Sequence, residues 1–170
     1  MLNGRRDTLL HGRSGYPLIL NSLLCVALAV YFEARNQPPA GQIAVAYVVL
    51  NRVADPRYPS DPCDVVMEGP THPNSPSNLP IRHRCQFSFF CDGRPEEITN
   101  MDAWREARMW SELAVNNAVD DVTYGATHYH TNAVWPFWAP YLTQTAVIED
   151  HIFYRNPDAP INPPVFLSGR

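Results

Sequence analysis

The chain has 170 residues, 45% of them hydrophobic, and a formal net charge of -4 at pH 7. This length suits one domain, which buries roughly two-thirds of the surface that its unfolded chain exposes. The acidic balance argues against a nucleic-acid partner, which would meet a basic face. The sequence has neither a glycine-rich phosphate loop nor an apolar run of about 20 residues, so nucleotide hydrolysis and an integral membrane span are not expected.

A first helix is predicted from Leu18 to just beyond Glu33. Apolar side chains recur at helical spacing, and most of the residues between them are also apolar, so the helix should be buried: Leu20, Leu23, Leu24, Ala27, Val30 and Tyr31. Asn36 and Pro38 should end it. Glu33 would then lie near the negative end of the helix dipole and near apolar surface, and both raise the pKa of a carboxyl. A carboxyl that keeps its proton can act as a general acid, although most glutamates are simply solvated.

A second helix is predicted from Gln42 to Val53. Ile43, Ala46, Val49 and Leu50 share one face, and the alanines allow a neighbouring helix to approach closely. Arg52 is either functional or a residue that bonds the last carbonyls of this helix, and the sequence assigns it no role.

Residues 54–99 contain too many prolines for a long helix, and such irregular segments are either functional or disordered. Within them, residues 86–90 alternate polar and aromatic side chains, which predicts a short strand or the lip of a groove. Amide and hydroxyl groups can donate and accept hydrogen bonds, so Gln86 and Ser88 are candidate substrate contacts. Phe87, Phe89 and Phe90 either stack on a ligand or belong to the core.

A third helix, read as scaffold, is predicted over residues 101–116 with Asn100 as its N-cap. Residues 122–141 are rich in aromatic side chains, and Pro136 and Pro140 break any long helix there. This segment is predicted to be a binding wall, with Tyr129 and His130 facing the substrate. The alternative is a packed aromatic corner.

The four cysteines divide into two groups. Cys25 lies in the first predicted helix and is expected to be a buried small hydrophobic residue. Cys63, Cys85 and Cys91 share a loop region, where one disulfide could form outside a reducing compartment and would leave the third thiol over. The sequence does not identify the pair.

Two other chemistries find partial signals in the sequence. His128 and His130 form an H-x-H element, and further ligands for zinc could come from His72, His83, Cys91, Asp92 and His151. No H-E-x-x-H and no paired C-x-x-C accompany it, so no metal or cofactor is expected. A Cys–His peptidase built on Cys85 or Cys91 is disfavoured because a turn follows Cys91. A binding module without catalysis is a further alternative.

Several motifs in the chain occur together and in order: E-A-R followed five residues later by G-Q-x-A-V-A-x-V-V-L-N-R-V (33–53), D-V-V (64–66), C-Q-F-S-F-x-C-D-G (85–93), G-A-T-H-Y-H (125–130) and H-I-F-Y (151–154). With them the chain resembles the SleB/CwlJ-type cell wall hydrolases, which include the spore cortex-lytic enzymes. The resemblance covers most of residues 24–155, and its opening block is the most specific part.

This resemblance implies an α+β, predominantly helical single domain with a lysozyme-like or lytic transglycosylase-like fold. The expected catalytic domain spans residues 17–158, between an N-terminal extension (1–16) and a C-terminal tail (159–170). The catalytic acid of the family's E-A-R element falls on Glu33. Gln37 stands where many relatives have a second glutamate, so Glu33 is the only acid of the opening block.

The implied substrate is the glycan strand of peptidoglycan, cut at the β-1,4 bond between N-acetylmuramic acid (MurNAc) and N-acetylglucosamine (GlcNAc). A lytic transglycosylase that leaves 1,6-anhydro ends is favoured, because the block supplies no second carboxylate. A hydrolytic muramidase is the alternative if Asp55, Asp64 or Asp92 folds across the cleft.

The resemblance also bears on where the protein acts. We expect a monomer that acts on the cell wall or in the periplasm, made in the cytoplasm and released as a phage-type lysin; a bacterial remodelling or germination enzyme fits nearly as well. Arg5, Arg6 and Arg13 precede an apolar run that ends at Ala27-Leu28-Ala29, the outline of a secretory signal. Cleavage there would remove the helix that carries Glu33, so a signal peptide is not expected.

Overall fold

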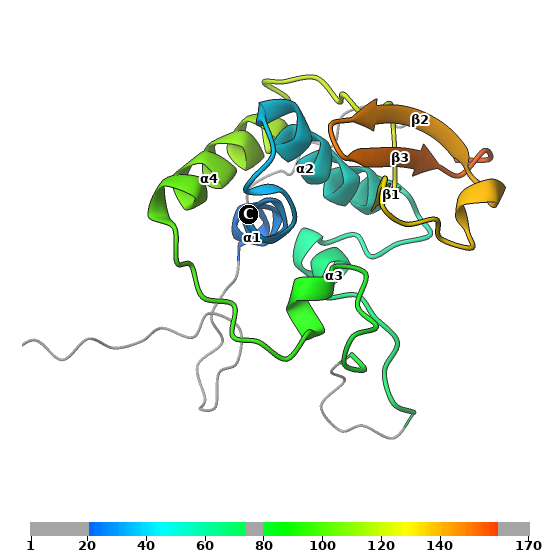
Figure 1. Ribbon diagram of the computed structural model, residues 1–170, viewed down its shortest axis with the longest axis horizontal. Helices are drawn as coiled ribbons and strands as arrows, with labels where there is room; N and C mark the ends of the chain where they lie inside the picture. Colours follow the sequence, from blue (N-terminus) through cyan, green and yellow to red (C-terminus); the bar gives the residue numbers. More distant parts are fainter. Residues whose placement is uncertain (1–20, 74–79, 160–170) are drawn as a thin grey trace, which may run out of the picture.

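The computed structural model describes residues 21–73 and 80–159, which form a group of helices beside a small antiparallel sheet (Figure 1). The elements in chain order are α1 (Ser22–Ala34), α2 (Pro39–Ala54), α3 (Pro62–Val66), the 3-10 turn η1 (Ser88–Cys91), α4 (Met101–Val115), β1 (His128–Thr131), the 3-10 turn η2 (Ala139–Tyr141), β2 (Thr143–Ile148) and β3 (His151–Arg155). This is the α+β, mainly helical architecture expected from the sequence.

Helix α1 is the central helix and packs against α2, α3 and α4 (Figure 1). Asn21 caps it by accepting a hydrogen bond from the backbone N–H of Leu24 at 2.8 Å. All side chains from Cys25 to Tyr31 are buried, as predicted, and the helix ends one residue after Glu33. The predicted start at Leu18 lies outside the described residues.

Helix α2 begins at Pro39, earlier than predicted, because proline has a backbone angle suited to the first helical position and needs no hydrogen-bond donor there. One face packs on α1 and α4. On another face Ala44 and Val48 form a second core cluster with Ala126 and Phe153. Helix α2 therefore lies between the other helices and the sheet, as Figure 1 shows.

The sheet has the strand order β1-β3-β2, with β3 antiparallel to both neighbours. Tyr129 of β1 pairs with Phe153 of β3, which places both side chains on one face. Because Phe153 is buried against α2, this face of the sheet is turned toward the helices.

Helix α4 confirms the third predicted helix and its cap. Asn100 accepts hydrogen bonds from the backbone N–H groups of Asp102 and Ala103 at 3.1 and 3.0 Å. The hydroxyl of Tyr31 in α1 accepts two more, from the backbone N–H groups of Thr99 and Asn100. The start of α4 is thus fixed both by its own cap and by the central helix.

Of the two alternatives predicted for residues 86–90, the strand was wrong: the segment leads into η1 and forms the lip of a pocket. The side chains of Phe87, Phe89 and Phe90 are buried, which agrees with the core alternative. Cys25 is buried but not a free thiol, because it is bonded to Cys63 of α3 with an S–S distance of 2.06 Å.

The second disulfide joins Cys85 to Cys91. No cysteine in residues 21–73 and 80–159 is left as a free thiol, contrary to the expectation of one left over. The sequence could not show that helix α3 brings Cys63 against the face of α1 that carries Cys25. Of the helices described, none is long and apolar enough to cross a bilayer.

Candidate active site

Glu33 lies at the second-last position of α1 with its side chain half-buried. Burial is the largest influence on this carboxyl and raises its pKa above the ordinary value. Hydrogen bonds from the hydroxyl of Tyr129 and from the backbone N–H of Ser88 favour the ionised form and offset part of that rise. The predicted placement of the acid at the end of a buried helix is what the structure has.

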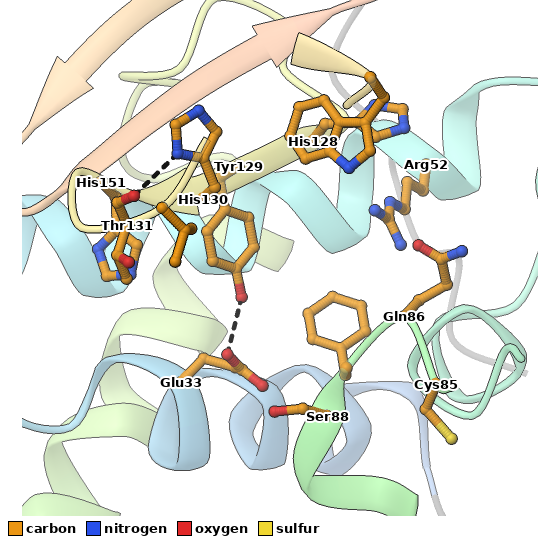
Figure 2. A pocket seen from close by; sticks show the side chains of 13 residues that line it. Glu33, Arg52, Cys85, Gln86, Ser88, His128, Tyr129, His130, Thr131 and His151 are labelled. Atoms are coloured by element: carbon orange, nitrogen blue, oxygen red, sulfur yellow. Dashed lines mark hydrogen bonds between the residues drawn. The ribbon is translucent and has the colours of Figure 1, made fainter. Parts of the chain in front are cut away.

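Tyr129 comes from β1, on the opposite side of the site. Its hydroxyl donates a hydrogen bond to Oε2 of Glu33 at 3.1 Å (Figure 2). Burial, and next the charge of Glu33, raise the pKa of Tyr129 well above its ordinary value, so the hydroxyl stays protonated and is the donor. The ring is held by Phe153, whose centroid lies 5.6 Å away, and by His151 at 5.3 Å.

A pocket of about 430 Å³ opens over this pair, and we call it the Tyr129 pocket. All five site residues predicted from the sequence line it: Glu33, Gln86, Ser88, Tyr129 and His130. In Figure 2 the side chain of Tyr129 reaches from β1 toward Glu33, and Gln86 and Ser88 lie across the open space from the strand. Among the described residues that line this pocket, Glu33 is the only carboxylic acid.

The wall opposite β1 is shaped by the loop that the Cys85–Cys91 disulfide closes. The backbone N–H of Gln86 donates to the carbonyl of Glu68 at 2.9 Å, and Phe87 is anchored in the core. Gln86 and Ser88, on either side of that anchor, are exposed and face the pocket. The predicted alternation of side chains is therefore real, although the backbone is a turn and not a strand.

Strand β1 is held in place by the last turn of α2. The side-chain amide of Asn51 donates to the carbonyl of Ala126 and to Asp121, each at 3.0 Å. Arg52 donates from Nε to the carbonyl of Thr127 at 2.7 Å. The turn before β1 also needs Gly125, whose φ of +82° favours glycine. These positioning residues were not identified from the sequence, although the N-R pair at the end of the opening motif block was a signal.

Arg52 also lines the Tyr129 pocket and is only 4% exposed, and its Nε bonds the carbonyl of Thr127, a residue outside α2. Its guanidinium lies 5.3 Å from the ring centre of Tyr58 and 5.5 Å from that of Phe87. Desolvation, and next the charge of Arg52, lower the pKa of His128 to about 4. His128 is therefore neutral at pH 7, and Arg52 supplies positive charge to this end of the pocket.

His130 has less freedom to meet a sugar than the sequence suggested. Its ring is buried, Nδ1 donates to the carbonyl of Thr131 at 2.8 Å, and Nε2 is hydrogen-bonded to the hydroxyl of Tyr154 at 3.0 Å. Both ring nitrogens are therefore engaged within the protein. His130 shapes the pocket wall, and Gln86 and Ser88 are the more accessible polar groups.

A second pocket of about 510 Å³ lies on the other side of Glu33 and Ser88, and we call it the Arg94 pocket. Its charged lining residues are Glu33, Arg35, Asp92, Arg94, Glu96 and Glu97. Glu33 therefore lines both pockets, so a polymeric substrate that extended from one pocket into the other would pass over its carboxyl.

The three aspartates considered as assisting acids have different surroundings. Asp92 lines the Arg94 pocket, whereas Asp55 and Asp64 line neither pocket. Asp55 is paired with Arg57, whose Nε donates to its Oδ1 at 2.8 Å, and this contact lowers its pKa. Glu96, buried in the wall of the Arg94 pocket, was not considered from the sequence.

The rival chemistries find less support. No three histidine, cysteine or acidic side chains in the described parts of the chain are grouped as a metal site would require. Cys91, a proposed ligand, is oxidised in the disulfide with Cys85. The same disulfide removes both thiols that a Cys–His peptidase would need as nucleophile, so that alternative was wrong.

Comparison with known sequences places these features in a family. A model of the cell wall hydrolase family matches residues 36–154, beginning just after Glu33. Spore cortex-lytic enzymes of Halalkalibacterium halodurans and Bacillus subtilis are 46% and 44% identical to the chain over 48 residues, which is 28% of this chain. The matched segments cover only 14% and 16% of those two relatives.

Two solved structures share the fold. The catalytic domain of the germination-specific lytic transglycosylase SleB from Bacillus anthracis is 28% identical, with a TM-score of 0.60 over 85% of this chain and all of that domain. The SleB catalytic domain from Bacillus cereus is 27% identical, with a TM-score of 0.56 over 90% of this chain and all of that domain. The lysozyme-like fold expected from the sequence is thereby confirmed, and the chain belongs to the cell wall hydrolase family of enzymes.

Proposed function

We propose that this protein is a peptidoglycan lytic transglycosylase in which Glu33 is the single catalytic acid. The observation that carries the proposal is that Glu33, a carboxyl with a raised pKa, is the only acid among the described residues lining the Tyr129 pocket. The relative from Bacillus anthracis is named as a lytic transglycosylase, which supports the same reaction class. The bond cut is the β-1,4 link between MurNAc and GlcNAc.

In the first step, protonated Glu33 gives its proton to the oxygen that bridges the two sugars. The bond from C1 of MurNAc to that oxygen breaks, GlcNAc leaves with a free hydroxyl, and positive charge develops on the MurNAc ring. General-acid assistance of this kind contributes roughly 10²- to 10⁴-fold in rate. The raised pKa of Glu33 favours the protonated form that this step needs.

In the second step, Glu33 is ionised and takes the proton of the 6-hydroxyl of MurNAc. The oxygen of that hydroxyl bonds to C1 and closes the 1,6-anhydro ring, so Glu33 regains its proton and no water is consumed. The hydrogen bond from Tyr129 stabilises the ionised carboxylate between the two steps. One acid therefore serves both as acid and as base.

The other site residues bind and orient the glycan in this proposal. Gln86 and Ser88 are exposed on the loop wall, where amide and hydroxyl groups can bond sugar hydroxyls and acetamido groups. Tyr129 orients Glu33, and His130 holds the opposite wall through its bonds to Thr131 and Tyr154. No metal or cofactor takes part.

A hydrolytic muramidase is the second candidate, because three acids line the Arg94 pocket together with Glu33: Asp92, Glu96 and Glu97. If one of them held a water beside the developing positive charge, the products would carry reducing MurNAc ends. The two reactions share the first step and differ in which oxygen then bonds to C1 of MurNAc, that of its own 6-hydroxyl or that of water.

The products of purified sacculi distinguish the candidates. Mass spectrometry of the released fragments should find MurNAc ends one water lighter than reducing ends, and the Glu33→Gln variant should release none. Reducing ends would establish a muramidase. Free peptides released from uncut glycans would overturn the glycosidase proposal and favour an amidase or peptidase.

We further propose that the protein acts as a monomer on the cell wall or in the periplasm, with residues 17–158 as its catalytic domain. A phage-type lysin released from the cytoplasm fits this reading, in which residues 22–29 stay in place as the first part of α1. Burial of Cys25–Tyr31 in the core supports that view, because cleavage after Ala29 would remove most of the central helix. The arginines at positions 5, 6 and 13 lie outside the described residues.

A further inference from the structure

The segment that joins β1 to β2, residues 132–142, exposes several large apolar side chains to solvent. We call it the aromatic loop; in Figure 1 it is the yellow and gold segment at the edge of the sheet. Trp135, Phe137 and Tyr141 are 69%, 86% and 77% exposed. Single exposed apolar residues are common, but three aromatic rings gathered on one short segment mark a surface that contacts something.

The loop is fixed against the sheet by other side chains. The ring of Trp138 turns inward and lies 5.2 Å from the ring centre of His128 and 5.6 Å from that of Tyr154. Ala139 is buried, and its backbone N–H donates to the carbonyl of Pro136 at 3.1 Å. Because Pro136 and Pro140 have fixed φ angles, the exposed rings are held out with little loss of freedom on binding.

The loop is continuous with the proposed active site. Val134 and Trp138 line the Tyr129 pocket, and the exposed rings of Trp135 and Phe137 lie between or beside them in the chain. Trp135 also makes an edge contact with His130 of the pocket wall, with 5.9 Å between ring centres. The aromatic loop is therefore the outer rim of the pocket that holds Glu33.

The pocket is too small to hold a whole glycan strand, so the aromatic loop could contact parts of the strand that lie outside the pocket. A volume of about 430 Å³ is in the range that encloses a ligand of drug size. A glycan strand is much longer, so sugars on either side of the cleaved bond must lie outside the pocket. The flat faces of pyranose rings are apolar, and exposed aromatic rings are suited to stack on them.

The charge of this surface disfavours other partners. Residues 131–150 contain no arginine or lysine, and Glu149 and Asp150 follow β2, with the backbone N–H of Asn132 bonded to the carbonyl of Asp150 at 2.8 Å. Anionic lipid surfaces and nucleic acids attract basic segments, whereas the aromatic loop is uncharged and its nearest charged neighbours in the sheet are acidic. The uncharged face of a sugar can stack on the exposed aromatic rings and needs no basic residue to bind it.

We propose that the aromatic loop is a distal glycan-binding surface, on which Trp135 and Phe137 stack against sugars of the strand beyond the Tyr129 pocket. This inference rests on the proposed function, because it takes the glycan as the substrate of that pocket. The loop would raise affinity for long strands and leave binding of a fragment that fills only the pocket unchanged.

The test uses the full chain carrying Glu33→Gln, so that bound glycan is not cut. The double variant Trp135→Ala/Phe137→Ala removes two exposed rings, which should not affect folding. Met109→Ala is the matched control, because Met109 is an exposed apolar side chain on α4 that lines neither pocket. Binding is measured by co-sedimentation with purified sacculi and, for a soluble disaccharide–peptide fragment, by calorimetry.

We expect the double variant to bind sacculi roughly tenfold more weakly, the order of magnitude for losing two aromatic contacts, and the control to bind normally. Affinity for the short fragment should not change. Unchanged binding to sacculi would overturn the proposal, as would an equal loss on the short fragment. Two other results would also overturn it. One is a double variant that loses binding to vesicles of phosphatidylglycerol but not to sacculi. The other is a protein that sediments as a dimer and that the double substitution converts to a monomer.

Failure of the proposed function would be seen separately. If the Glu33→Gln protein still released fragments from sacculi, Glu33 would not be the acid. The aromatic loop would still be judged by the difference in binding between the double variant and the Met109→Ala control.

Discussion

The hydroxyl of Tyr129 donates to Oε2 of Glu33 at 3.1 Å, although 96 positions separate the two residues. The contact exists because the last turn of α2 holds β1 through Asn51 and Arg52, which brings the strand over the end of α1. Two opposed effects therefore act on the acid: burial raises its pKa, and the tyrosine lowers it. Their balance suggests how the proposed chemistry responds to pH.

Replacing Tyr129 by Phe should shift the pH dependence of the reaction upward. The variant keeps the ring but loses the hydrogen bond that favours ionised Glu33, so the pKa of Glu33 rises further. Activity that needs protonated Glu33 falls as the pH rises through this pKa, and that basic limb should move to higher pH. The profile of kcat/KM against pH, measured on solubilised glycan strands, checks the shift.

A purely structural role for Tyr129 makes a different prediction. It would lower activity by the same factor at every pH and leave the basic limb in place. A downward shift of that limb would contradict the assignment of Glu33 as the acid, because the hydroxyl stabilises only the ionised carboxylate.

The two disulfides should contribute unequally to stability. The Cys25–Cys63 bond closes a loop with a sequence separation of 38, and the Cys85–Cys91 bond one of 6. By chain entropy alone they would stabilise the fold by about 4 and about 2 kcal/mol. Urea denaturation of the Cys25→Ala/Cys63→Ala and Cys85→Ala/Cys91→Ala variants should show the larger loss for the first pair.

The smaller loop should matter more for activity. Cys85 and Cys91 close the segment that presents Gln86 and Ser88 to the Tyr129 pocket. The Cys85→Ala/Cys91→Ala variant should therefore lose activity at temperatures where it is still folded. Full activity of this variant would show that the loop keeps its shape without the bond.

Folding stability should fall on acidification because of His128. Its pKa is about 4 in the folded protein and 6.5 ordinarily, so the unfolded chain binds more protons between these values. The stabilisation is therefore present above pH 6.5 and is lost as the pH falls toward 4. The full shift corresponds to at most about 3 kcal/mol, and solvent screening of this partly exposed ring reduces it.

The variant His128→Gln isolates this contribution. Glu33 acts in the opposite sense. Because its pKa is raised in the folded protein, stability falls as the pH rises above 4.5, the ordinary pKa of a glutamate. Urea unfolding at pH 7 and pH 4.5 should show a smaller pH dependence for His128→Gln than for the natural protein. An unchanged difference would mean that His128 is not held neutral by its surroundings.

Chelators should leave the activity intact. The H-x-H element is poorly suited to zinc, because both ring nitrogens of His130 are hydrogen-bonded within the protein, to the carbonyl of Thr131 and the hydroxyl of Tyr154. Release of fragments from sacculi should be the same with and without EDTA. Loss of activity on chelation and recovery with added zinc would move the chemistry to His128 and His130.

Much of the helical core was predictable from the sequence, because helical periodicity and a local N-cap determine it. The burial of α1, its end beyond Glu33 and the cap of α4 at Asn100 all follow from neighbouring residues. The alternation around Phe87 likewise predicted that Gln86 and Ser88 face outward, whatever the backbone does.

What could not be predicted depends on contacts between distant segments. The pairing of Cys25 with Cys63 requires α3 to pack on α1, and the role of Arg52 requires β1 to lie beside the end of α2. His130 was predicted to face the sugar because it lies in a segment rich in aromatic residues, yet its partner Tyr154 comes from another strand. Local patterns do not contain these neighbours.

The central claim is that Glu33 supplies the proton, and the most direct test is the clearing of purified sacculi by Glu33→Gln. We expect activity to fall by at least about 10²-fold, the low end for losing a general acid, while the melting temperature stays the same or rises because a partly buried ionisable group is gone. The control is Glu112→Gln, which makes the same chemical change at an exposed position of α4 and should keep full activity. A Glu33→Gln protein that clears sacculi at the natural rate would contradict the account.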